Sequence, residues 1–120
     1  MPQKIKLMCD YYCYPLWWTV GSGKAGDIDP ETLPLKPQTI QRLQVWADKF
    51  NSILNEEDPA SSGFAREADR EAFDREGISL WHQVISELEP EYEVHYFSQC
   101  LGKHFSTPRE LEIEQALIVA

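Results

Sequence analysis

The sequence contains no hydrophobic stretch long enough to cross a membrane. Its longest mainly apolar run covers residues 14–20, whereas a membrane-spanning helix needs roughly 18 or more apolar residues. Two lysines, Lys4 and Lys6, stand near the start, but no uninterrupted apolar stretch of the signal-peptide type follows them. We therefore expect a cytoplasmic protein that neither enters a membrane nor is secreted by the signal-peptide route.

Cysteine is also scarce, with three in 120 residues. An odd number of cysteines cannot all pair within one chain, and a domain of this length does not need a disulfide for stability. We expect Cys9, Cys13 and Cys100 to be free thiols in a reducing compartment.

Positive charge is the scarcer sign, with 11 lysines and arginines against 20 aspartates and glutamates. Residues 1–24 carry three lysines and one aspartate, a net charge of +2. Because the whole chain has a net charge of −9, residues 25–120 carry −11. An anionic surface repels nucleic-acid phosphates and acidic membranes and speeds encounter with a basic protein. The sequence therefore predicts a protein partner, and neither nucleic acid nor membrane.

What the chain does contain is the composition of one globular domain covering residues 1–120. Of its residues, 42% are hydrophobic and 26% are charged, and a chain of this length builds a single core. Alternating apolar residues predict strands over residues 4–10 and 92–97. Between them, apolar residues at intervals of three and four predict amphipathic helices over residues 37–55 and 66–88.

A third helix is predicted after the second strand. The helix is expected to begin with Thr107 as its N-cap, Pro108 as its first helical residue and Glu110 as the capping-box partner. It continues through Leu117. The order is strand, helix, helix, strand, helix, which is an α/β pattern. Two strands joined by a long helical connection are most simply parallel neighbours, so we expect a small parallel sheet packed by helices. Residues 11–26 are interpreted as a loop or an edge extension.

Gly77 interrupts the apolar stripe of the second predicted helix. Glycine at such a position costs about 1 kcal/mol relative to alanine. Its presence on the stripe itself indicates close packing of another element against the helix backbone.

The cysteines and histidines permit two chemical interpretations. Cys9 with Cys13, and Cys100 with His104, are couples of the kind that supply zinc ligands from two segments. A cysteine of the first couple, with His95 or His104 as base, also satisfies the composition of a nucleophilic site. The couples lack the glycine-rich flanks of zinc knuckles, lone cysteines are more often small buried apolar groups, and scattered histidines form such sets by chance. We predict no catalytic residue, no metal and no cofactor.

The strongest local anomaly is an aromatic block of five tyrosines and tryptophans within residues 11–18. One strand cannot bury so many rings on one face, so we expect about half to pack in the core and the others to lie at the surface. Exposed tyrosine and tryptophan beside acidic residues are typical of protein-recognition surfaces. The predicted partner-binding residues are Asp10, Tyr11, Tyr12, Tyr14, Trp17, Trp18, Asp27, Asp29, Glu56 and Glu57.

Two segments of the sequence resemble a family of small acidic bacterial immunity proteins. They are residues 6–17, KLMCDYYCYPLW, and residues 58–64, DPASSGF. Shorter similar segments lie at residues 27–30, 33–35 and 46–48. The resemblance covers most of residues 4–97, and the chain departs from the family pattern at Glu57, where Asp is common, and at Lys36, where a Ser-like cap is common.

Members of that family occur as partners of secreted toxins, including those of contact-dependent inhibition systems. The resemblance implies a protein that binds a cognate toxin domain one to one and blocks its active site, and the negative charge favours a nuclease with a basic cleft. Two alternatives stay open. One is a small metal-dependent enzyme or regulator built on Cys9, Cys13, Cys100 and His104, and the other is an adaptor for a protein that is not a toxin. Residues 99–120 lie outside the resemblance.

Overall fold

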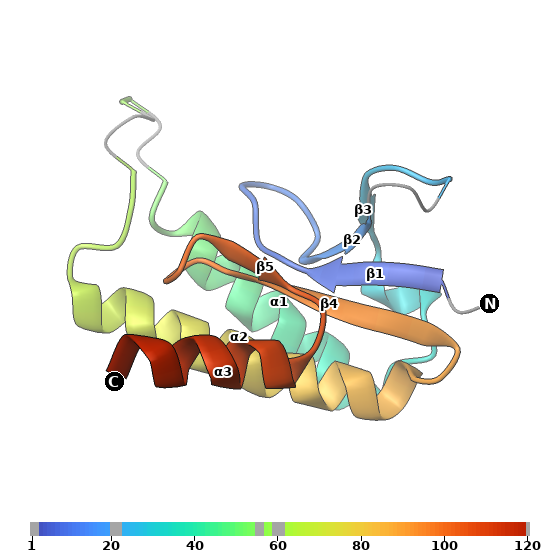
Figure 1. Ribbon diagram of the computed structural model, residues 1–120. Helices are drawn as coiled ribbons and strands as arrows, with labels where there is room; N and C mark the ends of the chain where they lie inside the picture. The colour runs from blue at the N-terminus through green and yellow to red at the C-terminus, as the bar shows by residue number, and fades with distance from the viewer. Residues whose placement is uncertain (1–2, 20–22, 55–56, 59–61, 120) are drawn as a thin grey trace.

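The computed structural model describes residues 3–19, 23–54, 57–58 and 62–119, which form a five-stranded sheet and three α-helices (Figure 1). The strands are β1 (Gln3–Leu7), β2 (Leu16–Trp18), β3 (Asp27–Ile28), β4 (Tyr92–Ser98) and β5 (Lys103–Phe105). The helices are α1 (Pro37–Asn51), α2 (Glu67–Leu88) and α3 (Pro108–Val119), with a short 3-10 helix, η1 (Pro30–Thr32), before α1. Across the sheet the strands stand in the order β3-β2-β1-β4-β5.

β1 and β4 form the centre of the sheet and run parallel, with Ile5 opposite Val94 and Leu7 opposite Tyr96. The connection between these strands contains α1 and α2, as a parallel crossover requires. The predicted α/β class and the parallel pairing of the two predicted strands are confirmed. The sequence predicts that the first strand extends to residue 10, and this bound is wrong, because the strand ends at Leu7.

The sheet is mixed, not purely parallel. β2 pairs antiparallel with β1 and with β3, and β5 pairs antiparallel with β4. β2 lies within the residues interpreted as a loop or edge extension, and β3 and β5 lie outside every predicted strand. These strands have only two or three residues, so they are too short to show a period-two pattern.

α1 begins at Pro37, the first helical position that the sequence predicts. The helix ends at Asn51, four residues before the predicted end at residue 55. The N–H groups of Ile53 and Leu54 donate to carbonyls three residues back, so the chain leaves the helix through tight turns.

α3 begins at Pro108, and its predicted capping residues act at this end of the helix. The Thr107 hydroxyl accepts the Glu110 N–H at 3.3 Å, as an N-cap does. The Glu110 carboxylate reaches one residue further back than a standard capping box, and accepts the Ser106 N–H at 3.1 Å.

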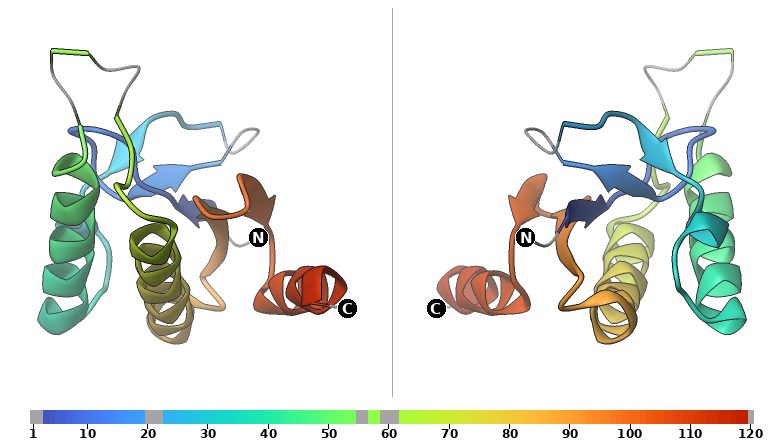
Figure 2. Two further views of the ribbon diagram at one scale, coloured as in Figure 1. Left: turned by 90° about the vertical axis from the view of Figure 1, so that its left-hand side faces the viewer. Right: turned by 90° about the vertical axis from the view of Figure 1, so that its right-hand side faces the viewer.

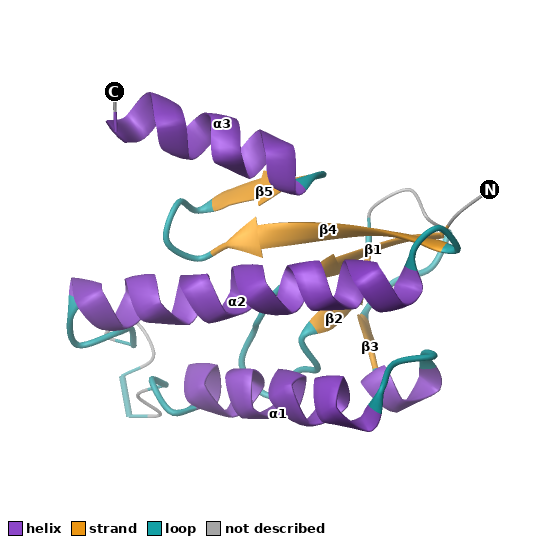
Figure 3. Ribbon diagram, turned by 90° about the horizontal axis from the view of Figure 1, so that it is seen from below, coloured by secondary structure: helices purple, strands orange, loops and turns teal. Residues whose placement is uncertain are grey.

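All three α-helices lie on the same side of the sheet, and no described helix lies over the opposite face (Figures 2 and 3). The helix-covered side receives Ile5 and Leu7 from β1 and Val94 and Tyr96 from β4, all buried. Because side chains alternate along a strand, Lys4, Lys6, His95 and their neighbours point to the uncovered side. No helix in the described part of the chain is long and apolar enough to span a membrane.

Two tryptophans fill the core between the helices and the sheet. Trp46 of α1 donates its indole N–H to the Phe73 carbonyl at 3.0 Å, and Trp81 of α2 donates to the Val94 carbonyl at 2.8 Å. Both rings are almost fully buried, so each buried donor has the partner it needs. A β-carbon on Gly77 would stand 2.6 Å from the Trp46 ring and overlap the Tyr96 hydroxyl. The close packing predicted at Gly77 is confirmed.

Candidate partner-binding surface

The loop that joins β1 to β2 is held in place by two side chains from distant parts of the chain. The N–H of Tyr14 donates to the Asp27 carboxylate at 2.8 Å, and the N–H of Tyr12 donates to the Asn51 amide oxygen at 2.9 Å. Pairing of β2 with β3 sets Trp17 opposite Asp27, which places that carboxylate beside the loop. The loop is therefore anchored at both the sheet and the end of α1.

Two rings of the aromatic block point outward from this loop. Tyr12 is 70% exposed and Tyr14 is 42% exposed. Tyr12 also has a positive φ of 60°, a conformation that is uncommon for a bulky residue and that its Asn51 contact helps to hold. Exposed rings on a fixed backbone lose little conformational freedom when they meet a partner, which suits them to recognition.

Tyr14 forms one wall of a groove of about 550 Å³ between the loop, η1 and α1. The residues lining this tyrosine groove are Tyr14, Asp29, Pro30, Glu31, Pro37, Ile40, Gln41 and Gln44. An adjoining hollow of about 320 Å³ has Tyr14 and Gln44 in common with it and adds Tyr12 and Asp27. The two spaces together present two phenol rings and three carboxylates.

The electrostatics of the tyrosine groove are set by its carboxylates. Asp29 is the N-cap of η1, where its side chain accepts the Glu31 N–H at 3.0 Å. The negative charge of Asp29 is the main cause that raises the pKa of the Tyr14 phenol, which therefore stays neutral. Carboxylates beside neutral aromatic rings are suited to bind the ammonium and guanidinium groups of a basic protein.

The other three rings of the block are anchored within the domain. Tyr11 stacks on Phe50 with centroids 4.6 Å apart. Trp18 packs against the core, and the Lys24 ammonium lies 4.3 Å from the centroid of its ring. Trp17 donates its indole N–H to the Met8 carbonyl at 2.9 Å. These rings hold the loop and sheet in place, whereas Tyr12 and Tyr14 present the surface.

The remaining predicted binding residues lie apart from the tyrosine groove. Asp10 is exposed, and its carboxylate accepts the N–H of Tyr11 at 2.8 Å. Glu57 is exposed in the connection between α1 and α2. Glu56 lies outside the described residues. Sequence reasoning missed Glu31, which joins the tyrosine groove only through the turn of η1.

The cysteine couples do not assemble as the metal interpretation requires. Within the described residues, no three His, Cys, Asp or Glu side chains are grouped so that they could hold a metal ion. Cys13 donates its thiol to the Tyr11 carbonyl at 3.4 Å, and His104 contacts His95 instead of Cys100. Burial raises the pKa of Cys9 far above its ordinary value, which makes this thiol a poor nucleophile.

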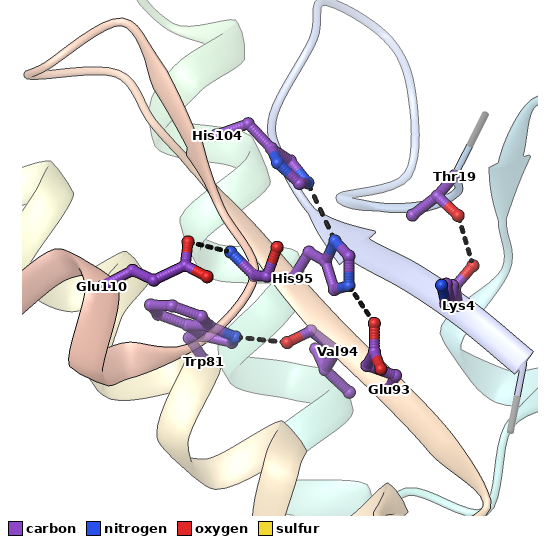
Figure 4. Close-up of polar contacts among 9 residues, drawn as sticks. Lys4, Thr19, Trp81, Glu93, Val94, His95, His104 and Glu110 are labelled. Carbon is purple, nitrogen blue, oxygen red and sulfur yellow. Dashed lines mark hydrogen bonds and ion pairs between the residues drawn. The ribbon is translucent and has the colours of Figure 1, made fainter.

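A second cluster, which sequence reasoning did not bring together, lies on the uncovered face of the sheet (Figure 4). His95 Nδ1 is 3.0 Å from His104 Nε2, and His95 Nε2 is 2.5 Å from the Glu93 carboxylate. Alternation along residues 92–97 places Glu93 and His95 on one side of the strand, but only the pairing of β4 with β5 brings His104 beside them.

The fold and surface have the features of a small protein-binding domain, namely exposed rings on an anchored loop and carboxylates grouped beside them. Residues 3–99 match the model of the family described as Serratia CdiI immunity protein-like. The chain belongs to this family, which confirms the resemblance to immunity proteins of contact-dependent inhibition. The matched residues include β1 to β4 and end before β5 and α3. The comparison with curated proteins gives no match.

Proposed function

We propose that the protein neutralises a cognate toxin domain by binding it one to one through the tyrosine groove and blocking its active site. The observation that carries this proposal is the convergence of Tyr14 with Asp27, Asp29 and Glu31 on one exposed surface. Membership of an immunity family supports it. An immunity protein needs no catalytic group, and it acts in the cytoplasm, where the toxin arrives.

The charge of this surface favours a nuclease as the toxin. A nuclease binds phosphates in a cleft lined by lysine and arginine, and carboxylates at phosphate-like spacing can occupy such a cleft. The net charge of −9 also accelerates encounter with a basic domain over distances longer than direct contact. The two exposed rings supply desolvated contact area that slows dissociation.

The test uses the cognate toxin domain, which is to be sought in the reading frames beside this gene. Purified toxin and immunity protein are mixed, the mass of the complex is measured by light scattering, and cleavage of RNA and DNA by the toxin is followed. We expect a one-to-one complex and loss of cleavage at equimolar immunity protein. A toxin domain from an unrelated system is the control and should stay active.

Two outcomes would contradict separate parts of the proposal. If no complex forms, the immunity function is wrong, and an adaptor for another protein becomes the better explanation. If a complex forms while the toxin cleaves no nucleic acid even when free, the nuclease assignment is wrong and the immunity function stands.

A further inference from the structure

The sheet face that the helices leave open is basic, in contrast to the acidic surface elsewhere. We call it the basic sheet face. A concavity of about 530 Å³ on this face is lined by Lys4, Lys6, Thr19, His95, Phe97 and His104. These residues come from β1, β4 and β5, whose pairing places them side by side, and from Thr19, which directly follows β2.

The two lysines of this face are available to an external anion. Neither ammonium forms an ion pair with a described residue, and the nearest acidic neighbour on the strands is Glu93. Glu93 is already engaged with His95 Nε2 at 2.5 Å. The hydrogen bond from His95 is the main cause that lowers the pKa of Glu93, so its charge faces His95. Lys4 stands opposite Glu93 and its charge also lowers the Glu93 pKa, so Glu93 offsets part of the Lys4 charge. The two lysines still outnumber the one carboxylate beside them, and the face carries a net positive charge.

The histidine pair adds positive charge that depends on its surroundings. Since the N–H of His95 Nε2 donates a hydrogen bond to Glu93, the nitrogens of His95 and His104 that face each other hold one proton between them when both rings are neutral. Burial, followed by the charges of His95 and Lys6, lowers the pKa of His104, and Glu110 acts in the opposite direction. An anion seated between Lys6 and His104 would relieve this repulsion and favour the protonated pair.

We propose that the basic sheet face receives an acidic segment of the toxin domain, whose carboxylates contact Lys4, Lys6 and His104 while apolar parts of the segment pack on Phe97. This inference rests on the proposed function, because it concerns the same partner. It adds that the toxin carries charges of both signs, a basic region for the tyrosine groove and an acidic segment for the opposite side of β1 and β2. Two surfaces of opposite sign would fix the orientation of the toxin, because the reversed arrangement sets like charges together.

A protein segment fits this face better than a nucleic acid does. Two lysines match about two carboxylates, with a third possible only when the histidine pair takes up an additional proton, whereas nucleic-acid grooves track a long row of phosphates with many cations. Glu93 and the overall charge of −9 would repel such a row. The concavity also contains the Phe97 ring, which suits an apolar side chain between two acidic residues.

The first test uses a synthetic peptide of alternating glycine and glutamate, ten residues long, added to the isotope-labelled full chain. NMR shift changes should map to the side chains of Lys4, Lys6, His95 and His104. They should increase as the pH falls from about 6.5 to 5, because burial and neighbouring positive charge hold the pKa of His104 below its ordinary value of 6.5. The Lys4→Gln/Lys6→Gln variant should weaken peptide binding about tenfold or more. The matched control, Lys36→Gln/Lys49→Gln, removes the same charge from the N-cap and the last turn of α1 and should bind as the parent does.

The proposal would be overturned if the peptide shifted resonances on another surface of the protein. It would also be overturned if the peptide bound the Lys4→Gln/Lys6→Gln variant as tightly as the Lys36→Gln/Lys49→Gln control. So would a single-stranded RNA of ten nucleotides that perturbs the same side chains at lower concentration than the peptide, because the face would then be a nucleic-acid site. If inorganic phosphate alone produced the full set of shifts, the face would be a site for small anions, and the proposal of an acidic protein segment would be wrong.

The second test separates this inference from the proposed function. The parent chain, the Lys4→Gln/Lys6→Gln variant and the Lys36→Gln/Lys49→Gln control are each titrated with the cognate toxin domain used to test the proposed function. We expect the Lys4→Gln/Lys6→Gln variant to bind the toxin about tenfold more weakly than the parent and the control do. If the parent binds no toxin, the proposed function fails. If all three bind equally well, the proposed function stands and the inference about the basic sheet face is wrong.

Discussion

The buried carboxylate of Asp74 on α2 accepts the hydroxyl proton of Tyr96 on β4 at 2.5 Å, and so ties the longest helix to the centre of the sheet. Ser98 donates to the second carboxylate oxygen at 3.0 Å. Burial and then the charge of Asp74 raise the pKa of Tyr96 far above its ordinary value, so the phenol remains a donor at every physiological pH. The carboxylate is hidden from water and depends on these two hydroxyls.

Removing the Tyr96 hydroxyl should therefore destabilise the fold. The Tyr96→Phe variant leaves one oxygen of a buried carboxylate without its strongest donor, and the expected loss is about 1 to 3 kcal/mol. Urea unfolding followed by tryptophan fluorescence measures it. Tyr92→Phe is the matched control, because Tyr92 is half-buried on the same strand, and it should unfold close to the parent. Equal midpoints for both variants would mean that the Asp74 contact adds no stability.

Gly77→Ala tests the close approach of α2 to the sheet and α1. Alanine improves helix propensity by about 1 kcal/mol, but its methyl group would overlap the Tyr96 hydroxyl and the Trp46 ring. Overpacking of a dense core costs about 1 to 3 kcal/mol or more, so we expect a net loss in thermal stability. Arg75→Ala, exposed on the same helix, should be neutral or slightly stabilising. A Gly77→Ala protein that melts above the parent would contradict the packing described.

Glu87 supplies the start of α1 with a cap that its own sequence lacks. Lys36, the N-cap residue, makes no side-chain cap hydrogen bond, and the Glu87 carboxylate accepts its N–H at 2.6 Å and the Thr39 hydroxyl proton. Burial raises the pKa of Glu87, but its hydrogen bonds from Lys36, Thr39 and Gln83 outweigh burial and hold the pKa below the ordinary value.

The Glu87→Gln variant should therefore change how stability depends on pH. Because the folded-state pKa is depressed, the stabilisation is present above the unfolded pKa of about 4.5 and is lost as pH falls through the folded value. The variant should melt below the parent at pH 7, and the two should converge near pH 3. Thermal unfolding at several pH values measures this. A constant difference between the two proteins across this range would show that the carboxylate charge is not the cause.

Charge at the tyrosine groove should govern how fast the toxin is captured. The Asp27→Asn/Asp29→Asn variant retains hydrogen-bond acceptors for Tyr14 and η1 while removing two charges, so the association rate should fall more than the dissociation rate rises. Surface plasmon resonance at low and high salt measures both rates. Glu71→Gln/Glu112→Gln removes the same charge from exposed positions on α2 and α3 and should have a smaller effect. An association rate that does not respond to salt would refute electrostatic steering.

The exposed rings should act on dissociation instead. Tyr12→Ala or Tyr14→Ala should speed release of the toxin and cost at least about 2 kcal/mol of binding free energy where the ring fills a partner pocket. Neither variant should change thermal stability much, because both rings are exposed. Tyr11→Ala is the contrasting variant: its ring stacks on Phe50, so it should lower the melting temperature. Binding unchanged in both exposed-ring variants would remove the tyrosine groove from the interface.

Local patterns in the sequence were sufficient to predict the long elements. The alternation through Ile5 and Leu7 and the three-and-four spacing in α1 and α2 arise from the geometry of a strand and a helix, and each is visible within one segment. The caps at Pro37 and Thr107 are equally local. The aromatic block and the family resemblance pointed to the loop on which Tyr12 and Tyr14 are exposed.

The sequence by itself determined the class of fold, its central parallel pair and the acidic character of the protein. Only the tertiary structure decided which residues share a surface. Asp27 reaches Tyr14 through pairing of β2 with β3, and His104 reaches His95 through β5. Such short strands carry no period of their own and exist because a neighbouring strand satisfies their backbone hydrogen bonds. The side of the sheet that the helices cover is likewise a property of the whole chain, and it leaves Lys4 exposed and Lys6 half-buried on the same open face.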